Sequence, residues 1–311
     1  MASCLVTGGG GFVGSNLVAA LLADGATVRV ADNFSTGRRD NLPRRHPCLE
    51  VVEGDLADLE FARVVVRQVE YVLHQAALPS VPRSVRDPIA SNDAGVGATL
   101  NVLVAAKDAG VRRVVYASSS SVYGEAVAGP KREDMPLAPL SPYAVSKMAG
   151  EHYCRAFHAV YGLETVALRY FNVFGPRQDP ASEYAAVIPK FIVALLGGGA
   201  PTIYGDGEQT RDFTFVGNVV AANLRALTVP GIGGGFFNIA MGQGTSLNRL
   251  VELLNTTIGT SIRPQYAEVR RGDIKHSTAD VSKIRAQLGF APNVNLLDGL
   301  AQTASWYRDG R

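Results

Sequence analysis

The sequence predicts an α/β fold in which a doubly wound parallel sheet carries a second, smaller α/β domain. Three observations lead to this prediction. Short β-rich runs alternate with helical patterns through the first 170 residues, a glycine-rich loop joins the first run to the first helix, and proline and glycine become frequent after residue 172. Alternating strands and helices are typical of parallel sheets with helices on both faces. With 311 residues, 47% of them hydrophobic, the chain can form one large or two modest domains.

The first predicted element is a strand followed by a glycine loop and a helix. Residues Ala2 to Thr7 are expected to form a short buried strand, and the loop begins at Gly8. A second β-rich run, Thr27 to Ala31, ends on Asp32, which lies 18 residues beyond Gly14. This is the dinucleotide-binding fingerprint of a Rossmann-type domain. Its glycines let the backbone approach a pyrophosphate, the helix N-terminus faces that group, and the acid accepts ribose hydrogen bonds.

The acid that ends the second strand also indicates which dinucleotide binds. A carboxylate at Asp32 would repel a 2′-phosphate, so NAD is favoured over NADP, although the nearby Arg38 and Arg39 keep NADP open. The cofactor contacts predicted from this region are Gly8, Gly11, Phe12, Val13, Gly14, Asp32, Asn33, Ser35, Thr36 and Gly37.

Later segments continue the alternation. Further strands are expected at Leu49 to Glu53, Tyr71 to Gln75, Arg113 to Ala117 and Thr165 to Tyr170, and helices near Phe61 to Gln68, Ile89 to Ala109 and Tyr143 to Tyr161. Ligands of such sheets gather at the carboxyl ends of the strands. Cofactor contacts are therefore also predicted at Asp55, Leu56, Gln75, Ala76, Ala77 and Tyr170. For the turns at 54–56 and 76–77, an ordinary structural role is an equally open interpretation.

The predicted domain division follows from the change in composition after Asn172, where proline and glycine become frequent. We expect a dinucleotide-binding domain formed by residues 1–170 plus about 215–240, because Val219 to Leu227 and Phe236 to Ile239 read as a helix and a strand that return to it. A substrate-binding domain is expected from about 171–214 plus 241–311, with helices at Leu247 to Ile258 and Leu296 to Tyr307.

Composition excludes several classes of protein. Thirty basic and 28 acidic residues give a net charge of +2 without a basic block, so neither nucleic acid nor an anionic membrane surface is indicated. Cys4, Cys48 and Cys154 are odd in number and lack metal-ligand or disulfide spacing, which favours a reducing cytoplasm. The loop at Gly8 leaves no room for a signal peptide, and no apolar stretch is long enough to span a membrane.

The histidines also show no metal-ligand spacing, so no metal site is predicted. They are His46, His74, His152, His158 and His276. His74 ends a predicted strand near the cofactor, and we interpret it as a packed histidine at the sheet edge.

A tyrosine and a lysine one helical turn apart are the predicted chemical centre. Ser141 can cap a helix that Pro142 begins, which places Tyr143 and Lys147 on one helix face. Lowering a phenol pKa from ~10 to about 7 takes roughly 4 kcal/mol. An ammonium held ~4 Å away supplies about that much at an effective dielectric near 20. Such pairs arise roughly 0.2 times by chance in a chain of this composition, so the pair needs support from other motifs.

Three motifs together resemble those of the extended short-chain dehydrogenase/reductase family. They are Thr7-Gly8-Gly9-Gly10-Gly11-Phe12-Val13-Gly14, Ser118-Ser119-Ser120-Ser121-Val122-Tyr123-Gly124 and Tyr143-x-x-x-Lys147. Within that family, four further motifs resemble those of nucleotide-sugar 4-epimerases, most closely those acting on UDP-N-acetylglucosamine. They are Arg169-Tyr170-Phe171-Asn172-Val173-Phe174-Gly175-Pro176-Arg177-Gln178, Ala185-Ala186-Val187-Ile188-Pro189-Lys190, Gly205-Asp206-Gly207-x-x-x-Arg211-Asp212-Phe213 and Arg270-x-Gly272-Asp273.

This resemblance implies a catalytic mechanism. Ser119, 24 residues before Tyr143, would share a hydrogen bond to the sugar 4-hydroxyl with the tyrosine. Tyr143 phenolate would take the 4-hydroxyl proton while the C4 hydride passes to NAD. Lys147 would hold the nicotinamide ribose and keep Tyr143 acidic. The 4-keto sugar would then turn and recover the hydride, so NAD is expected to stay tightly bound and to be regenerated in each turnover.

The resemblance also implies a substrate site and an assembly. Arg211 and Arg270 would clamp the diphosphate, because guanidinium groups fit phosphate oxygens bidentately. The other substrate contacts implied are Ser119, Tyr143, Asn172, Val187, Lys190, Tyr204, Asp273 and Ser277. In related epimerases restricted to unacetylated sugars, the position that matches Ser277 looks like a bulky tyrosine. The smaller serine would leave space beside C2 of the hexose. A homodimer through helices 89–109 and 143–161 is implied, although their apolar residues Val145, Met148, Ala149 and Phe157 would equally suit a monomer core.

Three alternatives stay open. A UDP-uronate epimerase is one, and a 4,6-dehydratase or decarboxylase of nucleotide sugars is another, although the run Ser119-Ser120-Ser121-Val122 lacks the carboxylate that such enzymes typically carry there. A non-catalytic NAD-binding regulator is the third, although such proteins usually lose the tyrosine or the lysine. The run Gly95-Val96-Gly97-Ala98-Thr99, where many relatives have Asn-Val-x-Gly-Thr, leaves the contacts behind the nicotinamide open.

Overall fold

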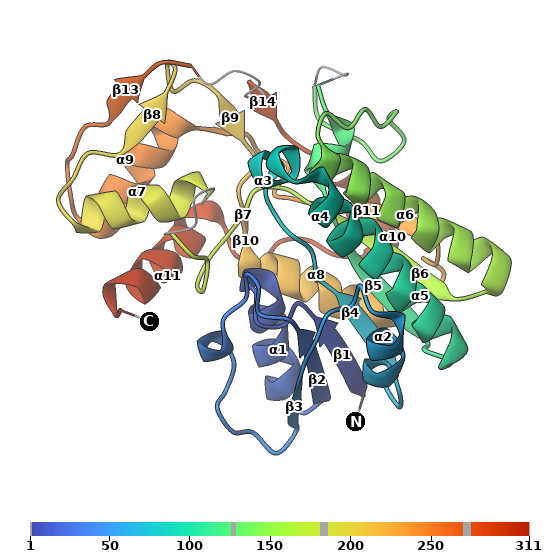
Figure 1. Cartoon of the computed structure of the whole chain (residues 1–311). Coiled ribbons are helices and arrows are strands. Elements are labelled where there is room, and N and C mark those ends of the chain that lie inside the picture. The colour runs from blue at the N-terminus through green and yellow to red at the C-terminus, as the bar shows by residue number, and fades with distance from the viewer. Residues whose placement is uncertain (1, 126–128, 181–185, 270–274, 311) are drawn as a thin grey trace.

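The central feature of the fold is a seven-stranded sheet, seen in a computed structural model that describes every residue except 1, 126–128, 181–185, 270–274 and 311 (Figure 1). Its strand order is β11-β6-β5-β4-β1-β2-β3, and all neighbours are parallel. The strands are β1 (Ser3–Thr7), β2 (Thr27–Asp32), β3 (Leu49–Glu53), β4 (Tyr71–His74), β5 (Arg113–Ser119), β6 (Glu164–Tyr170) and β11 (Gly235–Ile239). The predicted α/β fold with a parallel Rossmann-type sheet is confirmed.

The order of the strands creates a switch point. From β1 the chain builds outward through β2 and β3, and it then returns to add β4, β5 and β6 on the other side. Ligands of doubly wound sheets bind where this reversal occurs, beyond the carboxyl ends of the strands. The carboxyl ends of β1 and β4 flank the reversal, so the structure places the glycine loop at the expected position.

Two layers of helices cover the sheet, one on each face. α1 (Phe12–Ala23) and α8 (Val216–Thr228) belong to one apolar core. α2 (Leu59–Val65), α5 (Ala98–Asp108) and α6 (Pro142–Tyr161) belong to the core on the other face. Strands buried on both faces are expected to be continuously apolar, and Leu5, Val6, Val114 and Val115 are completely buried.

The single helix predicted from Ile89 to Ala109 is wrong in detail. The segment contains α4 (Pro88–Asn92), a π-helical turn (Asp93–Gly97) and then α5. Another short helix, α3 (Val81–Arg86), precedes it. A Cβ atom on Gly95 would lie 2.6 Å from the Ser146 Oγ of α6. The glycine thus allows the turn to approach α6 closely. A single π turn within a helical segment is rare, and the periodicity of the sequence does not predict it.

The rest of the chain forms a smaller α/β region beside the carboxyl edge of the sheet (Figure 1). It contains α7 (Val187–Leu196), α9 (Leu247–Ile258), α10 (Ser282–Leu288) and α11 (Leu296–Arg308). Its strands are β7 (Val173–Phe174), β8 (Thr202–Tyr204), β9 (Thr210–Arg211), β10 (Thr214–Phe215), β12 (Thr245–Ser246), β13 (Gln265–Ala267) and β14 (His276–Ser277). These short strands pair as β10-β7, β12-β9-β14 and β13-β8.

The three cysteines are free thiols. Cys4 and Cys154 are buried, and Cys48 is half-buried. Burial raises the pKa of the Cys4 thiol to about 11. In the part of the chain that the structure describes, no helix combines the length and the apolarity needed to cross a lipid bilayer.

Candidate active site

The glycine loop holds the end of β1, the start of α1 and the end of β4 in close contact. Gly8 has a left-handed φ of 65°, and a Cβ atom there would lie 2.8 Å from the backbone of Ala76. A Cβ atom on Gly14 would collide with the Gly8 carbonyl oxygen. α1 starts after Gly11 without a side-chain cap and without an acidic residue in its first turn. Its N–H groups and positive dipole end thus face the region where a pyrophosphate is expected.

Asp32 is a buried carboxylate at the end of β2, only 8% exposed. Its Oδ2 accepts a hydrogen bond from Gly10 N at 2.8 Å, and its Oδ1 accepts one from Phe34 N at 2.8 Å. Each oxygen keeps a further lone pair that can accept from a ribose hydroxyl. Gly37 packs against the same region, since a Cβ atom there would lie 3.0 Å from Asp32 Oδ2. These residues fit a dinucleotide.

The loop after Asp32 is fastened to the turn after β3. Asn33 Nδ2 donates to Asp55 Oδ2 at 3.1 Å, and Ser35 N donates to Asn33 Oδ1 at 3.1 Å. Arg39 is paired with Glu53 and lies 4.4 Å from the Phe34 ring centroid. Its guanidinium is therefore engaged away from the ribose contact, which favours NAD.

The other predicted cofactor residues line the ends of β4 and β6. The Tyr170 hydroxyl lies 3.2 Å from Gln75 Oε1 and 3.0 Å from Asn223 Oδ1. Asn223, on α8, is completely buried, and sequence reasoning missed it. Its only signal was a polar residue within the apolar pattern of Val219 to Leu227. Ala76 N donates to the Thr7 hydroxyl at 3.2 Å, which ties β4 to β1.

The remaining predicted contacts are backbone or packing positions. Phe12 and Val13 open α1, Thr36 and Ala77 lie in the loops after β2 and β4, and Leu56 is buried, with its carbonyl accepting from Asn101 Nδ2 at 2.9 Å.

His74 is a packed and uncharged histidine, as predicted. Its Nδ1 lies 2.7 Å from the Thr7 hydroxyl and its Nε2 lies 3.0 Å from the Thr99 hydroxyl, so both ring nitrogens have partners. Burial, and then the charge of Lys147, lower the pKa of His74 to about 3. The imidazole therefore supports the sheet edge and does not act as a base at neutral pH.

The chemical centre lies at the N-terminus of α6. Ser141 caps the helix by accepting from Ala144 N at 3.2 Å, and Pro142 occupies its first turn. Lys147 Nζ donates to the Ala117 carbonyl at 2.7 Å and lies 5.9 Å from the Tyr143 ring centroid. The structure thus brings the tyrosine, the lysine and the end of β5 together, as the sequence predicted.

Ser119 ends β5 beside Tyr143. Its Oγ accepts from Ser121 N at 3.2 Å and from Ser121 Oγ at 2.9 Å. It also lies close enough to Tyr143 to lower the pKa of that phenol. Ser118, one residue earlier, points to the other face of the strand, where it is 3% exposed. Only Ser119 of these two therefore reaches the tyrosine.

The electrostatics differ from the sequence-based expectation. Burial raises the pKa of Tyr143, and the hydrogen bond from Ser119 opposes this rise only in part. Burial also lowers the pKa of Lys147 to about 8, against the charges of Glu151 and Cys154. Lys147 does not by itself offset the effect of burial on the Tyr143 pKa, because burial in the apolar interior penalises both charged forms.

A cavity of about 480 Å³ lies between α7, β8 and β9. Five of the residues implied as substrate contacts line it, namely Asn172, Val187, Lys190, Tyr204 and Arg211. Ser277 pairs with Arg211 in the register of β14 and β9. Arg270 and Asp273, the other implied contacts, lie outside the described residues.

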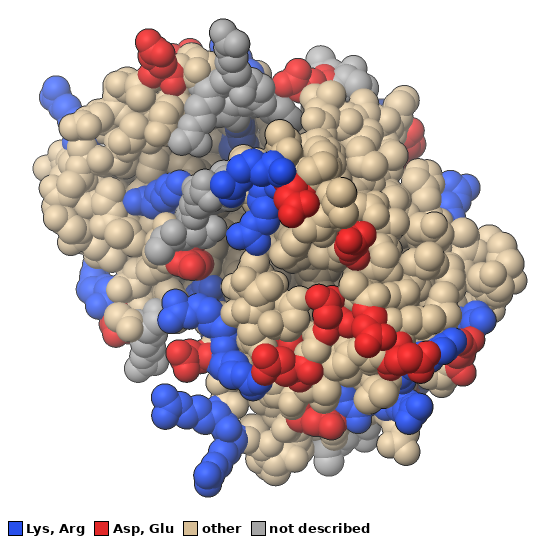
Figure 2. Space-filling view, viewed as in Figure 1, with Lys and Arg blue, Asp and Glu red and all other residues tan. Residues whose placement is uncertain are grey.

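Positive charge collects around this side of the molecule. Figure 2 shows Lys and Arg side chains gathered around the hollow between the two parts of the molecule, while many Asp and Glu side chains on this face lie below and to the right of it. Such a distribution attracts an anionic ligand. Among the residues that the structure describes, no group of three or more His, Cys, Asp or Glu side chains could hold a metal ion.

The fold and the site together define a dinucleotide-dependent α/β enzyme. More specifically, the chain belongs to the NAD dependent epimerase/dehydratase family, which matches residues 4–240. Its fold is that of the extended short-chain dehydrogenases/reductases, and its cofactor is NAD, in agreement with the sequence-based predictions.

Three relatives illustrate the similarity. A UDP-glucose 4-epimerase from Mycolicibacterium smegmatis is 41% identical over 309 residues, which are 98% of this chain and 98% of the relative. The solved structure of UDP-N-acetylglucosamine 4-epimerase from Methanobrevibacter ruminantium M1 in complex with UDP-N-acetylmuramic acid has a TM-score of 0.95 and 42% identity, covering 100% of this chain and 99% of that one. A dTDP-glucose 4,6-dehydratase from Streptomyces griseus is 37% identical over 315 residues, which are 99% of this chain and 94% of the relative.

Proposed function

We propose that this chain is a UDP-hexose 4-epimerase that works through a transient 4-keto sugar. The observation that carries the proposal is the position of Ser119, Tyr143 and Lys147. They meet at the carboxyl edge of the sheet, with the glycine loop and Asp32 at the same edge and the cavity beneath α7 in the neighbouring region. The reacting carbon can thus lie between a cofactor and a proton acceptor, as C4 oxidation requires.

The catalytic roles follow from this geometry. Tyr143 takes the proton of the sugar 4-hydroxyl, and Ser119 donates or accepts a hydrogen bond at the same oxygen. NAD, held by the glycine loop and Asp32, would supply the hydride acceptor and donor for C4. Because burial holds Tyr143 protonated in the protein alone, its phenolate forms only when positive charge lies beside it. Lys147 provides one such charge and is available for ribose hydroxyls next to its bond with Ala117 O.

The cavity is the proposed site of the UDP group. Lys190 and Arg211 on its wall supply positive charge for a diphosphate, and Tyr204 and Val187 supply surface for a base. Asn172 has a left-handed φ of 35° and donates to the Asp212 carbonyl at 3.3 Å, which fixes its amide at the start of the cavity. Arg270 and Asp273 are proposed to complete the diphosphate clamp and the ribose contact.

We propose UDP-N-acetylglucosamine and UDP-N-acetylgalactosamine as the preferred pair, with UDP-glucose and UDP-galactose also accepted. Ser277 supports this preference, because it lies beside Arg211 on β14 and its small side chain leaves room for an acetamido group. A roomy pocket does not exclude the smaller sugars. Relatives named for each sugar pair are similar to this chain at nearly equal identity.

The alternatives make different products. A dehydratase or decarboxylase needs an additional acid or base beside the catalytic residues, and Ser119, Ser120 and Ser121 place only hydroxyl groups there. A uronate epimerase would need a cation for the C6 carboxylate. A regulator would bind the same ligands without turnover.

Two structural proposals accompany this function. The proposed dinucleotide-binding domain comprises residues 1–170 plus about 215–240, because β11 joins the large sheet and α8 covers one of its faces. Residues of about 171–214 plus 241–311 form the proposed nucleotide-sugar domain. The homodimer is proposed to form through residues 89–109, which include α5, and residues 143–161 of α6, where Ile89 and Val145 are 74% and 45% exposed. Phe157, in contrast, is buried in the monomer core.

One experiment tests the proposed activity. The purified protein is incubated with each UDP-hexose and UDP-hexuronate without added reductant, and the products are followed by proton NMR. We expect each 4-epimer to appear with no net NADH and no 4-keto-6-deoxy sugar. Stoichiometric dehydration, loss of CO₂ or binding without any product would reject the proposal and identify which alternative holds.

A further inference from the structure

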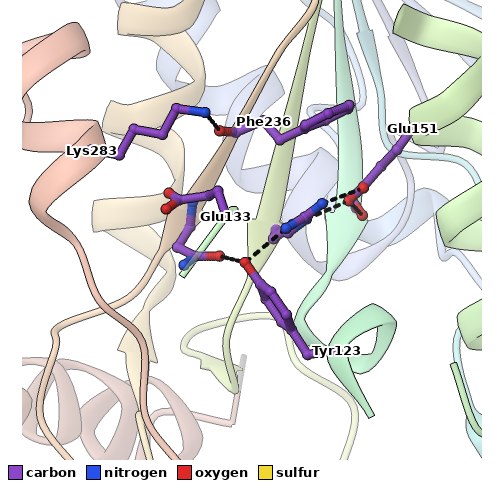
Figure 3. A network of polar contacts seen from close by, with 8 residues as sticks. Tyr123, Glu133, Glu151, Phe236 and Lys283 are labelled. Atoms are coloured by element: carbon purple, nitrogen blue, oxygen red, sulfur yellow. Dashed lines mark hydrogen bonds and ion pairs between the residues drawn. The ribbon is translucent and has the colours of Figure 1, made fainter. Parts of the chain in front are cut away.

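A buried ion pair lies directly behind the catalytic residues. Arg169 on β6 meets Glu151 on α6 through two parallel bonds, Nε to Oε1 at 2.8 Å and Nη2 to Oε2 at 2.7 Å. Their side chains are 2% and 1% exposed. Figure 3 shows Glu151 and Tyr123 as members of one polar network.

Glu151 lies on the helix of two catalytic residues and bonds to the neighbour of the third. It follows Lys147 by one helical turn and Tyr143 by two, so the three lie along one face of α6. Its Oε1 also accepts a hydrogen bond from Ser118 Oγ at 2.5 Å. Ser118 is the residue before Ser119, so one carboxylate links the helix of the tyrosine and lysine to the strand of the serine.

Arg169 is fixed from the opposite side. Its Nη1 donates to the Tyr123 hydroxyl at 2.8 Å, and that hydroxyl donates to Asn238 Oδ1 at 2.7 Å. Asn238, on β11, donates in turn to the Lys131 and Asp280 carbonyls at 2.8 and 3.2 Å. Because the guanidinium uses three of its nitrogens in fixed directions, it cannot follow Glu151 if α6 slides along the sheet.

Stability alone is a poor account of this pair. A buried ion pair often contributes little net free energy, because desolvation of both charges offsets their attraction. The bidentate geometry restricts the position of α6 relative to β6 far more than a contact between apolar side chains would.

The charge of Glu151 also acts on Lys147. The groups facing the ammonium are Tyr143, Glu151 and Cys154 on its own helix, Tyr116 on β5 at 5.0 Å, and His74 on β4, which is uncharged. Among the influences that raise the pKa of Lys147 against burial, the Glu151 charge is the largest. Removal of that charge should therefore make the ammonium lose its proton at lower pH.

We propose that Glu151 and Arg169 form a positioning pair that sets the placement of Ser119, Tyr143 and Lys147 and keeps Lys147 charged during turnover. This inference rests on the proposed epimerase function for its kinetic part and on the structure alone for its electrostatic part.

The test is Glu151→Gln, which keeps the shape of the side chain and removes its charge. We expect turnover to fall at least ~10-fold at pH 8, with KM changed less than about 2-fold, because the affected groups act on the reacting atoms. The alkaline limb of the turnover–pH profile should move down by roughly one pH unit. An unshifted limb would overturn the electrostatic part of the proposal.

Two further variants separate positioning from stability. Arg169→Lys keeps the charge but loses the fork, so turnover should fall without movement of the alkaline limb; full turnover would overturn the positioning part. Glu164→Gln is the matched control, because Glu164 pairs with Arg113 at 2.8 Å across the opposite ends of the same strands, β5 and β6. It should lower the melting temperature at most and leave the profile unchanged. A profile shift as large as that of Glu151→Gln would show that any ion-pair loss has this effect.

A substrate-free measurement keeps the inference testable without epimerase activity. The Lys147 side chain can be titrated by NMR through its ¹³Cε resonance in the NAD-bound protein, with and without Glu151→Gln. The lysine should titrate at lower pH in the variant. An unchanged titration contradicts this inference, whereas inactivity on UDP-hexoses contradicts only the proposed function.

Discussion

Replacement of Tyr143 by phenylalanine tests the catalytic assignment most directly. The change removes one hydroxyl from a half-buried ring and leaves the ring in place. Its cost to folding is small, because Ser119, the polar group beside this hydroxyl, keeps its bonds to Ser121. One lost hydrogen bond destabilises the protein by about 0.5–1.5 kcal/mol, which lowers the melting temperature by only a few degrees in a chain of this size.

The expected cost to catalysis is much larger. Loss of a positioned general base lowers turnover by at least ~100-fold, which corresponds to about 2.7 kcal/mol in the barrier. Turnover is measured by NMR with saturating UDP-hexose, and UDP binding is measured by calorimetry. We expect UDP affinity to stay within about 3-fold of the wild type, because the hydroxyl lies at the sugar and not at the diphosphate. Near-normal turnover in the variant would refute the assignment of the base.

Tyr116 provides a matched control for this variant. It is another buried tyrosine, with its ring 5.0 Å from Lys147 Nζ, and its hydroxyl makes no hydrogen bond of normal geometry to the described residues. Tyr116→Phe should therefore keep turnover within about 2-fold and should change stability little, since a buried hydroxyl without a well-formed hydrogen bond contributes little. A large loss of turnover in both variants would mean that the apolar environment, and not the Tyr143 hydroxyl, is what the reaction requires.

Three further predictions follow from single residues. Asp32→Ala should weaken NAD retention by about 1.5–3 kcal/mol, measured by the cofactor content of the purified protein, and full retention would contradict the ribose contact. Ser277→Tyr should lower kcat/KM for the N-acetylated sugars by roughly 5- to 150-fold more than for the unacetylated pair, and equal losses would show that Ser277 is not the gate. Burial raises the pKa of Asp212 to about 6, against backbone hydrogen bonds that include those from Ala279 and Gly242. The folded state therefore binds this proton more tightly than the unfolded state, so the group adds stability as pH falls from about 6 towards 4, by up to ~3 kcal/mol. Urea unfolding should show this trend in the wild type and lose it in Asp212→Asn; an identical trend in both would exclude Asp212 as its source.

The sequence predicted the strands and helices of the sheet well because their signals are local. In the smaller region, α9 was also predicted with its observed bounds, Leu247 to Ile258, from its helical pattern. The start of α6 was predicted from Ser141 and Pro142 for the same reason. Where a local conformation depends on contact between segments distant in the chain, no pattern in the sequence predicted it. The π turn near Gly95 forms because that glycine meets Ser146, a neighbour that only the fold creates.

The candidate site shows the same limit. The grouping of Ser119, Tyr143 and Lys147 followed from motifs, but the direction of the Tyr143 pKa depends on burial, which no motif displays. Arg169 stood in the sequence as a charge inside a β-rich run, which is a signal of a buried ion pair. Its partner could not be identified, because Glu151 comes opposite it only when α6 packs across β5 and β6.

The late position of β11 has a consequence for synthesis of the chain. β6 occupies residues 164–170, and its outer neighbour β11 occupies residues 235–239, so the ribosome must complete the whole excursion from 171 to 234 before the sheet can close. During that interval the outer edge of β6 carries unpaired backbone groups beside Val166, Ala167 and Leu168, which all become buried in the finished fold. Apolar edges of this kind pair readily with other nascent chains. Chains that terminate before residue 235 are therefore expected to aggregate, even though they contain Ser119, Tyr143 and Lys147.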